Sequence, residues 1–147
     1  VLLSTCLMDR LGRRLLLLSS MCGMILSIGL LSAALVRGYV PLVVVGIVLF
    51  VGSFGLGLGP VVWLLPAELF PMSRRASATA AVTCVNWLAN FAVGQSFPLI
   101  AGVLGPWSFV PFGAVLLLAL IFAHQSVPET RGRTLEEIER MMVELRD

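Results

Sequence analysis

Four long stretches without a single Asp, Glu, Lys or Arg divide this chain of 147 residues. They are residues 15–36, 40–67, 76–101 and 107–127. Each reaches or exceeds the roughly 20 residues that a helix needs to cross about 30 Å of hydrocarbon. Every backbone polar group inside a bilayer must be bonded within the protein, so such segments are expected to be helices. The sequence therefore predicts an all-α integral membrane protein with four complete spans.

The composition agrees with this class and excludes others. The chain is 59% hydrophobic and 12% charged, with a mean hydropathy of +1.01, whereas about a quarter of a soluble domain is charged. A net charge of +2 is too small to indicate a nucleic-acid partner. The three cysteines, Cys6, Cys22 and Cys84, are scattered through apolar runs and predict neither a disulfide framework nor a metal site. We expect no metal and no cofactor, and the lipid bilayer as a partner.

The remaining segments are short and polar or incomplete. Residues 1–8 are apolar and read as the end of a further span, so we expect the chain to be a fragment of a longer parent protein. Residues 128–147 form a polar tail, in which Thr134 and Glu137 have the spacing of a capping box. The tail is therefore predicted to hold a short amphipathic helix.

The arginines predict the orientation in the membrane. If successive loops alternate sides, nine arginines share one side of the membrane and only Arg37 lies on the other. The nine are Arg10, Arg13, Arg14, Arg74, Arg75, Arg131, Arg133, Arg140 and Arg146. The positive-inside rule places the arginine-rich side, and with it the C-terminus, in the cytoplasm.

The second span contains a glycine- and proline-rich stretch before an aromatic residue. Gly55, Gly59 and Pro60 are predicted to form a hinge or kink, because proline removes a backbone donor and clashes with the preceding turn. Close helix packing by small residues is the alternative. Trp63 follows within a turn, and its ring could stack on the apolar face of a sugar.

The third span carries two amides at helical spacing. Asn86 and Asn90 are four residues apart, so they share a helix face, and Trp87 is adjacent. Amides are costly against lipid and are expected to face protein or a water-filled cavity. A hydrogen bond between packed helices is the alternative to a cavity.

Acidic and basic residues collect at the predicted cytoplasmic ends of the spans. One interpretation is ordinary solvated charge, and the sharper one is a latch of ion pairs that closes a pathway from the inside. No acidic residue lies deep inside a span, which disfavours proton coupling. The single histidine, His124, lies near the end of the last span and is not predicted to relay protons.

These motifs together resemble a known family. The pattern consists of DRLGRR, GP-x-x-W followed by E-L-F-P-x-x-x-R, N-W-x-x-N and PETRGRTLEEI, in this order. It is similar to the sugar porter family of the major facilitator superfamily, and closest to the animal facilitative hexose transporters. The resemblance implies a twelve-helix fold, of which this chain would hold the end of helix eight, helices nine to twelve and a short cytoplasmic C-terminal helix.

The resemblance also implies roles for individual residues. Its sugar-contacting positions fall on Trp63, Asn86, Trp87 and Asn90. Its cytoplasmic salt-bridge network falls on Asp9, Arg10, Arg13, Arg14, Glu68, Arg75, Glu129 and Arg131. Two positions depart from the pattern of the glucose carriers, Gly55 and Val62, so the identity of the sugar stays open among glucose, fructose, another hexose or a polyol.

The prediction for function is transport of a hexose by alternating access, most simply by facilitated diffusion, as part of the parent chain with its missing N-terminal helices. The alternatives are a transport-inactive truncated protein that associates through its helices, and a proton-coupled sugar or polyol symporter. No set of residues indicates an enzyme. The plasma membrane is favoured over an intracellular membrane.

Overall fold

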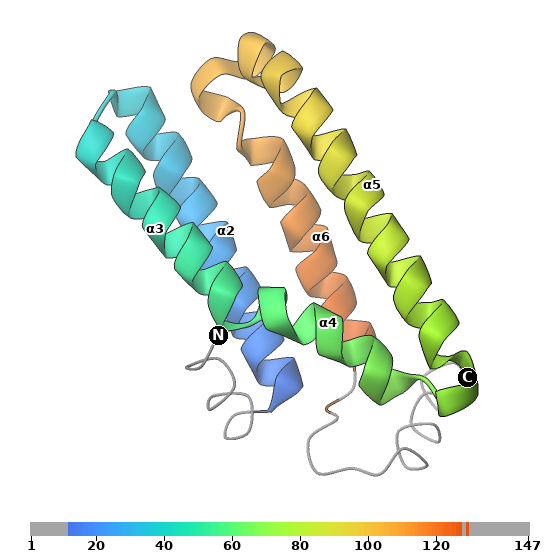
Figure 1. Ribbon diagram of the computed structural model, residues 1–147. Helices are drawn as coiled ribbons and strands as arrows, with labels where there is room; N and C mark the ends of the chain where they lie inside the picture. The colour runs from blue at the N-terminus through green and yellow to red at the C-terminus, as the bar shows by residue number, and fades with distance from the viewer. Residues whose placement is uncertain (1–11, 128, 130–147) are drawn as a thin grey trace.

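Regular structure in the described part of the chain is entirely helical. The computed structural model describes residues 12–127 and Glu129, with the backbone alone for residues 67–69. The elements are α2 (Arg13–Arg37), α3 (Val40–Leu56), α4 (Leu58–Leu69), α5 (Met72–Leu104), the short 3₁₀ helix η1 (Gly105–Trp107) and α6 (Val110–Ser126) (Figure 1). The predicted span end at residues 1–8 and the tail helix predicted after Thr134 lie outside the described residues.

The helices have the length and composition of membrane spans. Three segments of the described chain are apolar and long enough to cross a bilayer: Arg13–Arg37, Val40–Pro66 and Met72–Trp107. The last helix, α6, is apolar but shorter, with 17 residues. The predicted class, an all-α membrane protein, is confirmed. The predicted second span, residues 40–67, is occupied by α3 and most of α4.

Helices α2 and α3 form a tight antiparallel pair. Gly38 ends α2 with φ +65°, a left-handed conformation that glycine adopts without steric cost. The amides of Gly38 and Tyr39 donate to the carbonyls of Leu35 and Ala34 at 3.2 and 3.1 Å, which satisfies the end of the helix. Farther along the pair, a Cβ added to Gly46 would lie 2.8 Å from the Leu31 side chain, so the backbones approach closely there.

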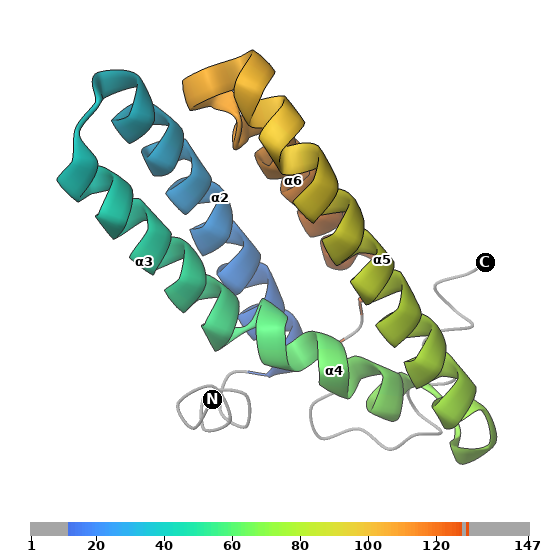
Figure 2. The same ribbon diagram turned by 45° about the horizontal axis from the view of Figure 1, so that its top comes forward.

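Helix α2 is the centre of packing in the described chain. A core of Leu16, Leu17 and Met21 contacts Val61 of α4 and Ala123 of α6. In the most apolar 18-residue stretch of α2, half of the residues are buried, whereas none are buried in the corresponding stretch of α5. Figure 2 shows α5 apart from the α2–α3 pair. Its contacts with the rest of the described chain lie mainly at its two ends, with α4 and with η1.

The charged ends of the helices lie together. The start of α2, the junction of α4 with α5 and the end of α6 all lie at the lower end in Figure 1. Arg13, Arg14, Arg74 and Arg75 are therefore at this end, and Arg37 lies at the opposite one. These arginines are therefore grouped as expected if successive loops alternate between the two sides of the membrane.

Candidate functional site

The second membrane segment is interrupted at one residue. Gly57 has φ −134° and ψ −70°, which ends α3 at Leu56 and lets α4 begin at Leu58 in a new direction (Figure 1). Pro60 explains the position, because its ring clashes with the carbonyl four residues earlier, which belongs to Leu56. Within α4, Pro60 occupies the first turn, where its missing N–H is no loss. The structure thus places the interruption between Gly55 and Gly59, the glycines predicted for the hinge.

The predicted sugar contacts lie on α4 and α5, two helices that contact each other. Trp63 is 48% exposed and Trp87 is 66% exposed. The Asn90 side-chain nitrogen donates to the Asn86 carbonyl of its own helix at 2.8 Å. Within the described part of the chain, the side-chain amide of Asn86 makes no hydrogen bond. Trp63, Trp87 and Asn90 are therefore exposed and Asn86 is partly buried. None of the four lines the apolar cavity described next.

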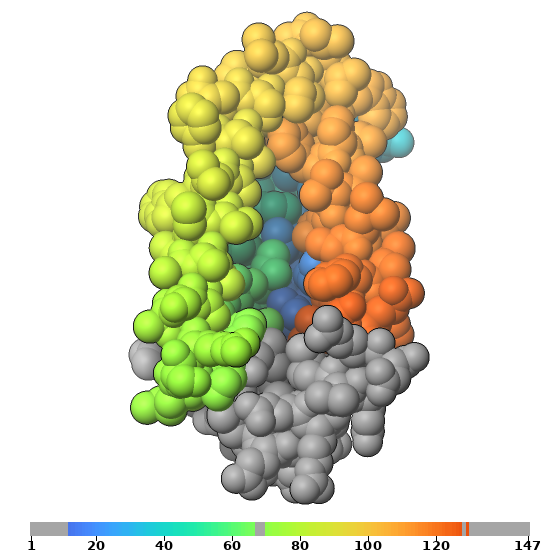
Figure 3. Space-filling model, turned by 90° about the vertical axis from the view of Figure 1, so that its right-hand side faces the viewer, coloured from blue at the N-terminus to red at the C-terminus, as the bar shows by residue number. Residues whose placement is uncertain are grey.

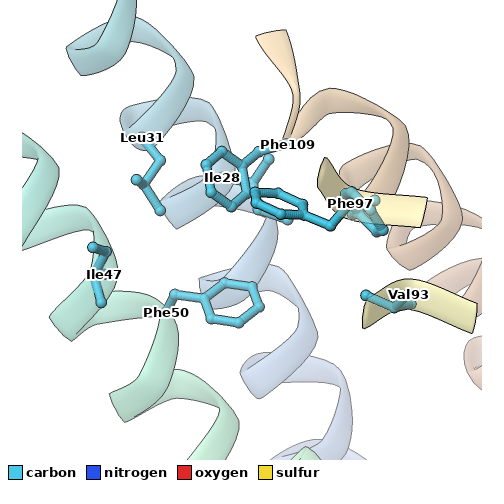
Figure 4. A pocket seen from close by; sticks show the side chains of 8 residues that line it. Ile28, Leu31, Ile47, Phe50, Val93, Phe97 and Phe109 are labelled. Atoms are coloured by element: carbon cyan, nitrogen blue, oxygen red, sulfur yellow. The ribbon is translucent and has the colours of Figure 1, made fainter. Parts of the chain in front are cut away.

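An apolar cavity of about 320 Å³ opens between four helices. It is lined by Ile28, Leu31, Ile47, Phe50, Val93, Phe97, Phe109 and Phe112 (Figure 4). Figure 3 shows the hollow between α5 and α6, with α2 and α3 behind it. Phe97 contacts Phe109 and Phe112 with ring-centroid distances of 5.4 and 6.0 Å. No side chain in this lining can bond a hydroxyl, so the cavity is unsuited to a sugar.

Glu129 binds the beginning of α2. Its carboxylate oxygens accept hydrogen bonds from the backbone amides of Arg13 at 3.0 Å and Arg14 at 3.2 Å. A helix start leaves such amides unpaired and carries a partial positive charge, and α2 has neither an acidic residue in its first turn nor a side-chain cap. Gly12 makes room for this contact, because an added Cβ would lie 2.6 Å from a Glu129 oxygen.

The other members of the predicted salt-bridge network are only partly described. Asp9, Arg10, Arg131 and the side chain of Glu68 lie outside the described part of the structure. The Arg75 guanidinium donates to the Met72 sulfur at 3.1 Å, and its Nε is buried without an acceptor among the described residues. Arg14 donates to the His124 carbonyl at 2.6 Å, which ties the start of α2 to the end of α6. The ion-pair latch stays a prediction.

Two residues important at the helix break were not predicted. Gly57 lies in the predicted glycine-rich stretch but was not among the predicted hinge residues. The ring of Pro60 clashes with the carbonyl of Leu56, and the break therefore falls at the next residue, Gly57. Ser20 lies on α2, and its hydroxyl bonds to both sides of the break. No sequence signal connects a serine in one apolar span to a glycine in the next, because their contact depends on how the helices pack.

Comparison with known proteins identifies the family. The family profile described as "Sugar (and other) transporter" matches residues 1–142. The chain belongs to the sugar transporter family. This confirms the resemblance seen in the motifs, and because the relatives are transporters, it also confirms that the chain is not an enzyme.

Relatives in this sugar transporter family come from plants and animals. "Sugar transporter ERD6-like 8" of Arabidopsis thaliana is 39% identical, over 95% of this chain and 32% of the relative. "Solute carrier family 2, facilitated glucose transporter member 2" of Gallus gallus is 40% identical, over 92% of this chain and 26% of the relative. Member 4 of the same group in Homo sapiens is 39% identical, over 93% and 28%.

Solved structures in the sugar transporter family share the fold. The proton:xylose symporter XylE bound to 6-bromo-6-deoxy-D-glucose matches with a TM-score of 0.86 and 31% identity, over 96% of this chain and 31% of that protein. An inward-open form of the xylose transporter XylE from E. coli matches with a TM-score of 0.81 and 31% identity, over 95% and 32%. The fold is that of part of a major facilitator transporter. The chain spans about a third or less of the length of the relatives it matches.

Proposed function

We propose that this chain forms part of a hexose transporter that works by alternating access and by facilitated diffusion. The single observation that carries the proposal is the unburied surface of α5. It presents Asn86 and Asn90 from a helix with no buried residue, next to α4, which presents Trp63. Amides of this kind do not face lipid at low cost, so they would face a water-filled path in the parent protein.

The chemistry of this surface suits a sugar. A hexose has apolar C–H faces, which stack on an indole ring, and hydroxyl rims, which need donors and acceptors such as amides. We infer that Trp63, Asn86, Trp87 and Asn90 contact the sugar, with Gly55, Gly59 and Pro60 shaping the break that orients Trp63. Other helices of the parent chain would supply the opposite wall of the path.

Facilitated diffusion is preferred over proton symport for a simple reason. Between residues 15 and 127 the only acidic residue is Glu68, at the end of α4 and at the arginine-rich end of the bundle. A proton-coupled route needs a titrating group along the path, and these helices bring none into it.

In proteoliposomes of the full-length parent, hexose uptake should therefore be unchanged when a pH gradient is imposed or collapsed.

Trp63→Ala in the parent protein is expected to weaken hexose binding about tenfold or more, a loss of about 1.4 kcal/mol or more. The reason is the loss of the stacking surface on α4. Trp107→Ala is the matched control, because this tryptophan is 56% exposed but lies in η1 at the opposite end of α5. Equilibrium binding and uptake of labelled hexoses are the measurements. Equal hexose affinity in the two variants would remove Trp63 from the sugar site.

The orientation is tested by labelling. We propose that the end of the bundle with Arg13, Arg14 and Arg75 is cytoplasmic, together with the C-terminus, and that the protein resides in the plasma membrane. In a cysteine-free parent, a cysteine at Tyr39 should react with an impermeant maleimide on intact cells. A cysteine at Ser73, at the start of α5, should react only after permeabilisation. The reverse pattern would overturn the orientation.

A further inference from the structure

The interruption at Gly57 breaks the regular hydrogen-bond ladder of the segment. In a continuous helix, the Gly57 amide would donate to the Ser53 carbonyl and the Leu58 amide to the Phe54 carbonyl. The backbone angles of Gly57 end this pattern. In a span surrounded by hydrocarbon, an unpaired backbone group costs several kcal/mol. The structure must therefore supply other partners at this point.

Ser20 of α2 supplies partners for two of these groups, the Ser53 carbonyl and the Leu58 amide. Its hydroxyl donates to the Ser53 carbonyl at 2.7 Å and accepts from the Leu58 amide at 3.0 Å. The Ser53 carbonyl belongs to α3 and the Leu58 amide is the first of α4, so a single hydroxyl bridges both sides of the break. The residue is 4% exposed, so water does not compete for these bonds.

The turn of α2 around Ser20 also fits tightly against the break. A Cβ added to Gly57 would overlap the Leu16 carbonyl oxygen and lie 2.6 Å from the Ser20 Cβ. The first residue of α4 is thus held at a fixed place on α2. From there α4 runs toward the arginine-rich end of the helix bundle (Figure 2). Any swing of α4 relative to α3 changes the distances from the Ser20 hydroxyl to its two partners.

We propose that Ser20 is a positioning residue that fixes the angle between α3 and α4, and through α4 the placement of Trp63. Its hydroxyl gives the Ser53 carbonyl and the Leu58 amide new partners on a neighbouring helix. This deepens the proposed function, since it rests on α4 carrying a sugar contact. In the transport cycle, the Ser20 bridge opposes reorientation of α4 and sets how often it occurs.

The test uses the full-length parent without its native cysteines. Spin labels at Val45 on α3 and Leu64 on α4, both exposed, report the distance between the two helices by pulsed electron paramagnetic resonance. Ser20→Ala should broaden or shift the distance distribution. It should also change hexose turnover by about 3- to 10-fold, the size expected for one hydrogen bond of ordinary net strength.

Ser27→Ala is the matched control. Ser27 is on the same helix and 3% exposed, but its hydroxyl donates to the Gly23 carbonyl of its own helix at 2.7 Å. Its removal should leave the α3–α4 distance unchanged. Ser20→Thr keeps the hydroxyl and should restore the parental distribution. If Ser20→Ala does not yield folded protein, Ser20→Gly, which also removes the hydroxyl and adds no thiol for the label, takes its place.

The outcomes separate this proposal from the proposed function. The spin-label distance needs no sugar, so failure of hexose transport in the parent would leave the Ser20 result standing. An unchanged α3–α4 distribution in Ser20→Ala, or an equal change in Ser27→Ala, would overturn the role of Ser20. Hexose transport by the parent would be unaffected by that result.

Discussion

Replacing Gly57 by valine is expected to prevent the full-length parent from folding into a monodisperse, transport-competent form. Even alanine would place its Cβ on the Leu16 carbonyl oxygen, and a helix backbone cannot move aside as a flexible side chain can. The helices α2 and α4 would have to separate, which opens the core around Val61. Overpacking typically costs about 1–3 kcal/mol, and valine at a backbone contact belongs at the upper end.

The measurement is thermal unfolding in detergent together with the monodisperse yield. Gly52→Ala is the control, because nothing lies within 4 Å of a Cβ added at Gly52 and the residue is inside α3. Alanine is favoured over glycine in a helix interior by about 1 kcal/mol, so Gly52→Ala should be as stable as the parent or more so. If Gly57→Ala matched Gly52→Ala, the close seat of the break on α2 would be wrong.

Glu129→Ala is expected to lower the stability of the parent by about 1–3 kcal/mol, the cost of leaving two partly buried amides without their charged acceptor. The Arg13 and Arg14 amides would lose their acceptor, and the positive end of α2 its only nearby carboxylate among the described residues. Hydrogen exchange at these two amides should become faster, while the centre of α2 stays protected. Exchange at Arg13 and Arg14 that did not respond would contradict the capping role.

Two further variants refine the role of Glu129. Glu129→Gln keeps an oxygen acceptor but loses the charge, so its effect should be smaller than that of alanine. Gly12→Ala should resemble Glu129→Ala, because Gly12 has φ +90° and an added Cβ would collide with the carboxylate. Gln125→Ala, at an exposed position on α6, serves as the control and should leave exchange at the start of α2 unchanged.

Much of the fold follows from local signals in the sequence. Uncharged runs predict the spans, and Pro60 predicts an interruption in the second segment. The arginine-rich loops mark which helix ends lie together, and the structure brings Arg14 to the end of α6. These features depend on residues close in the chain or on a side-of-membrane rule, so they can be read without coordinates.

The candidate site is less predictable because its contacts are long-range. Glu129 was predicted in a network with arginine side chains, which stays a prediction. What could not be predicted is that its carboxylate also binds backbone amides 115 and 116 residues away in the chain. Which donors a carboxylate meets depends on how α6 ends against α2. Ser20 similarly resembles any small residue of an apolar helix until the neighbouring helix breaks beside it. The roles of Trp63, Asn86 and Asn90 come from the family motifs and remain predictions.

The uncovered surface of α5 has a consequence for insertion into the membrane. A newly inserted helix that carries Asn86 and Asn90 without burying a single residue is energetically unfavourable in lipid. We expect it to stay beside the insertion machinery, or under a membrane chaperone, until protein covers it. In copies that fail to assemble, the same two amides would mark the helix for extraction and degradation.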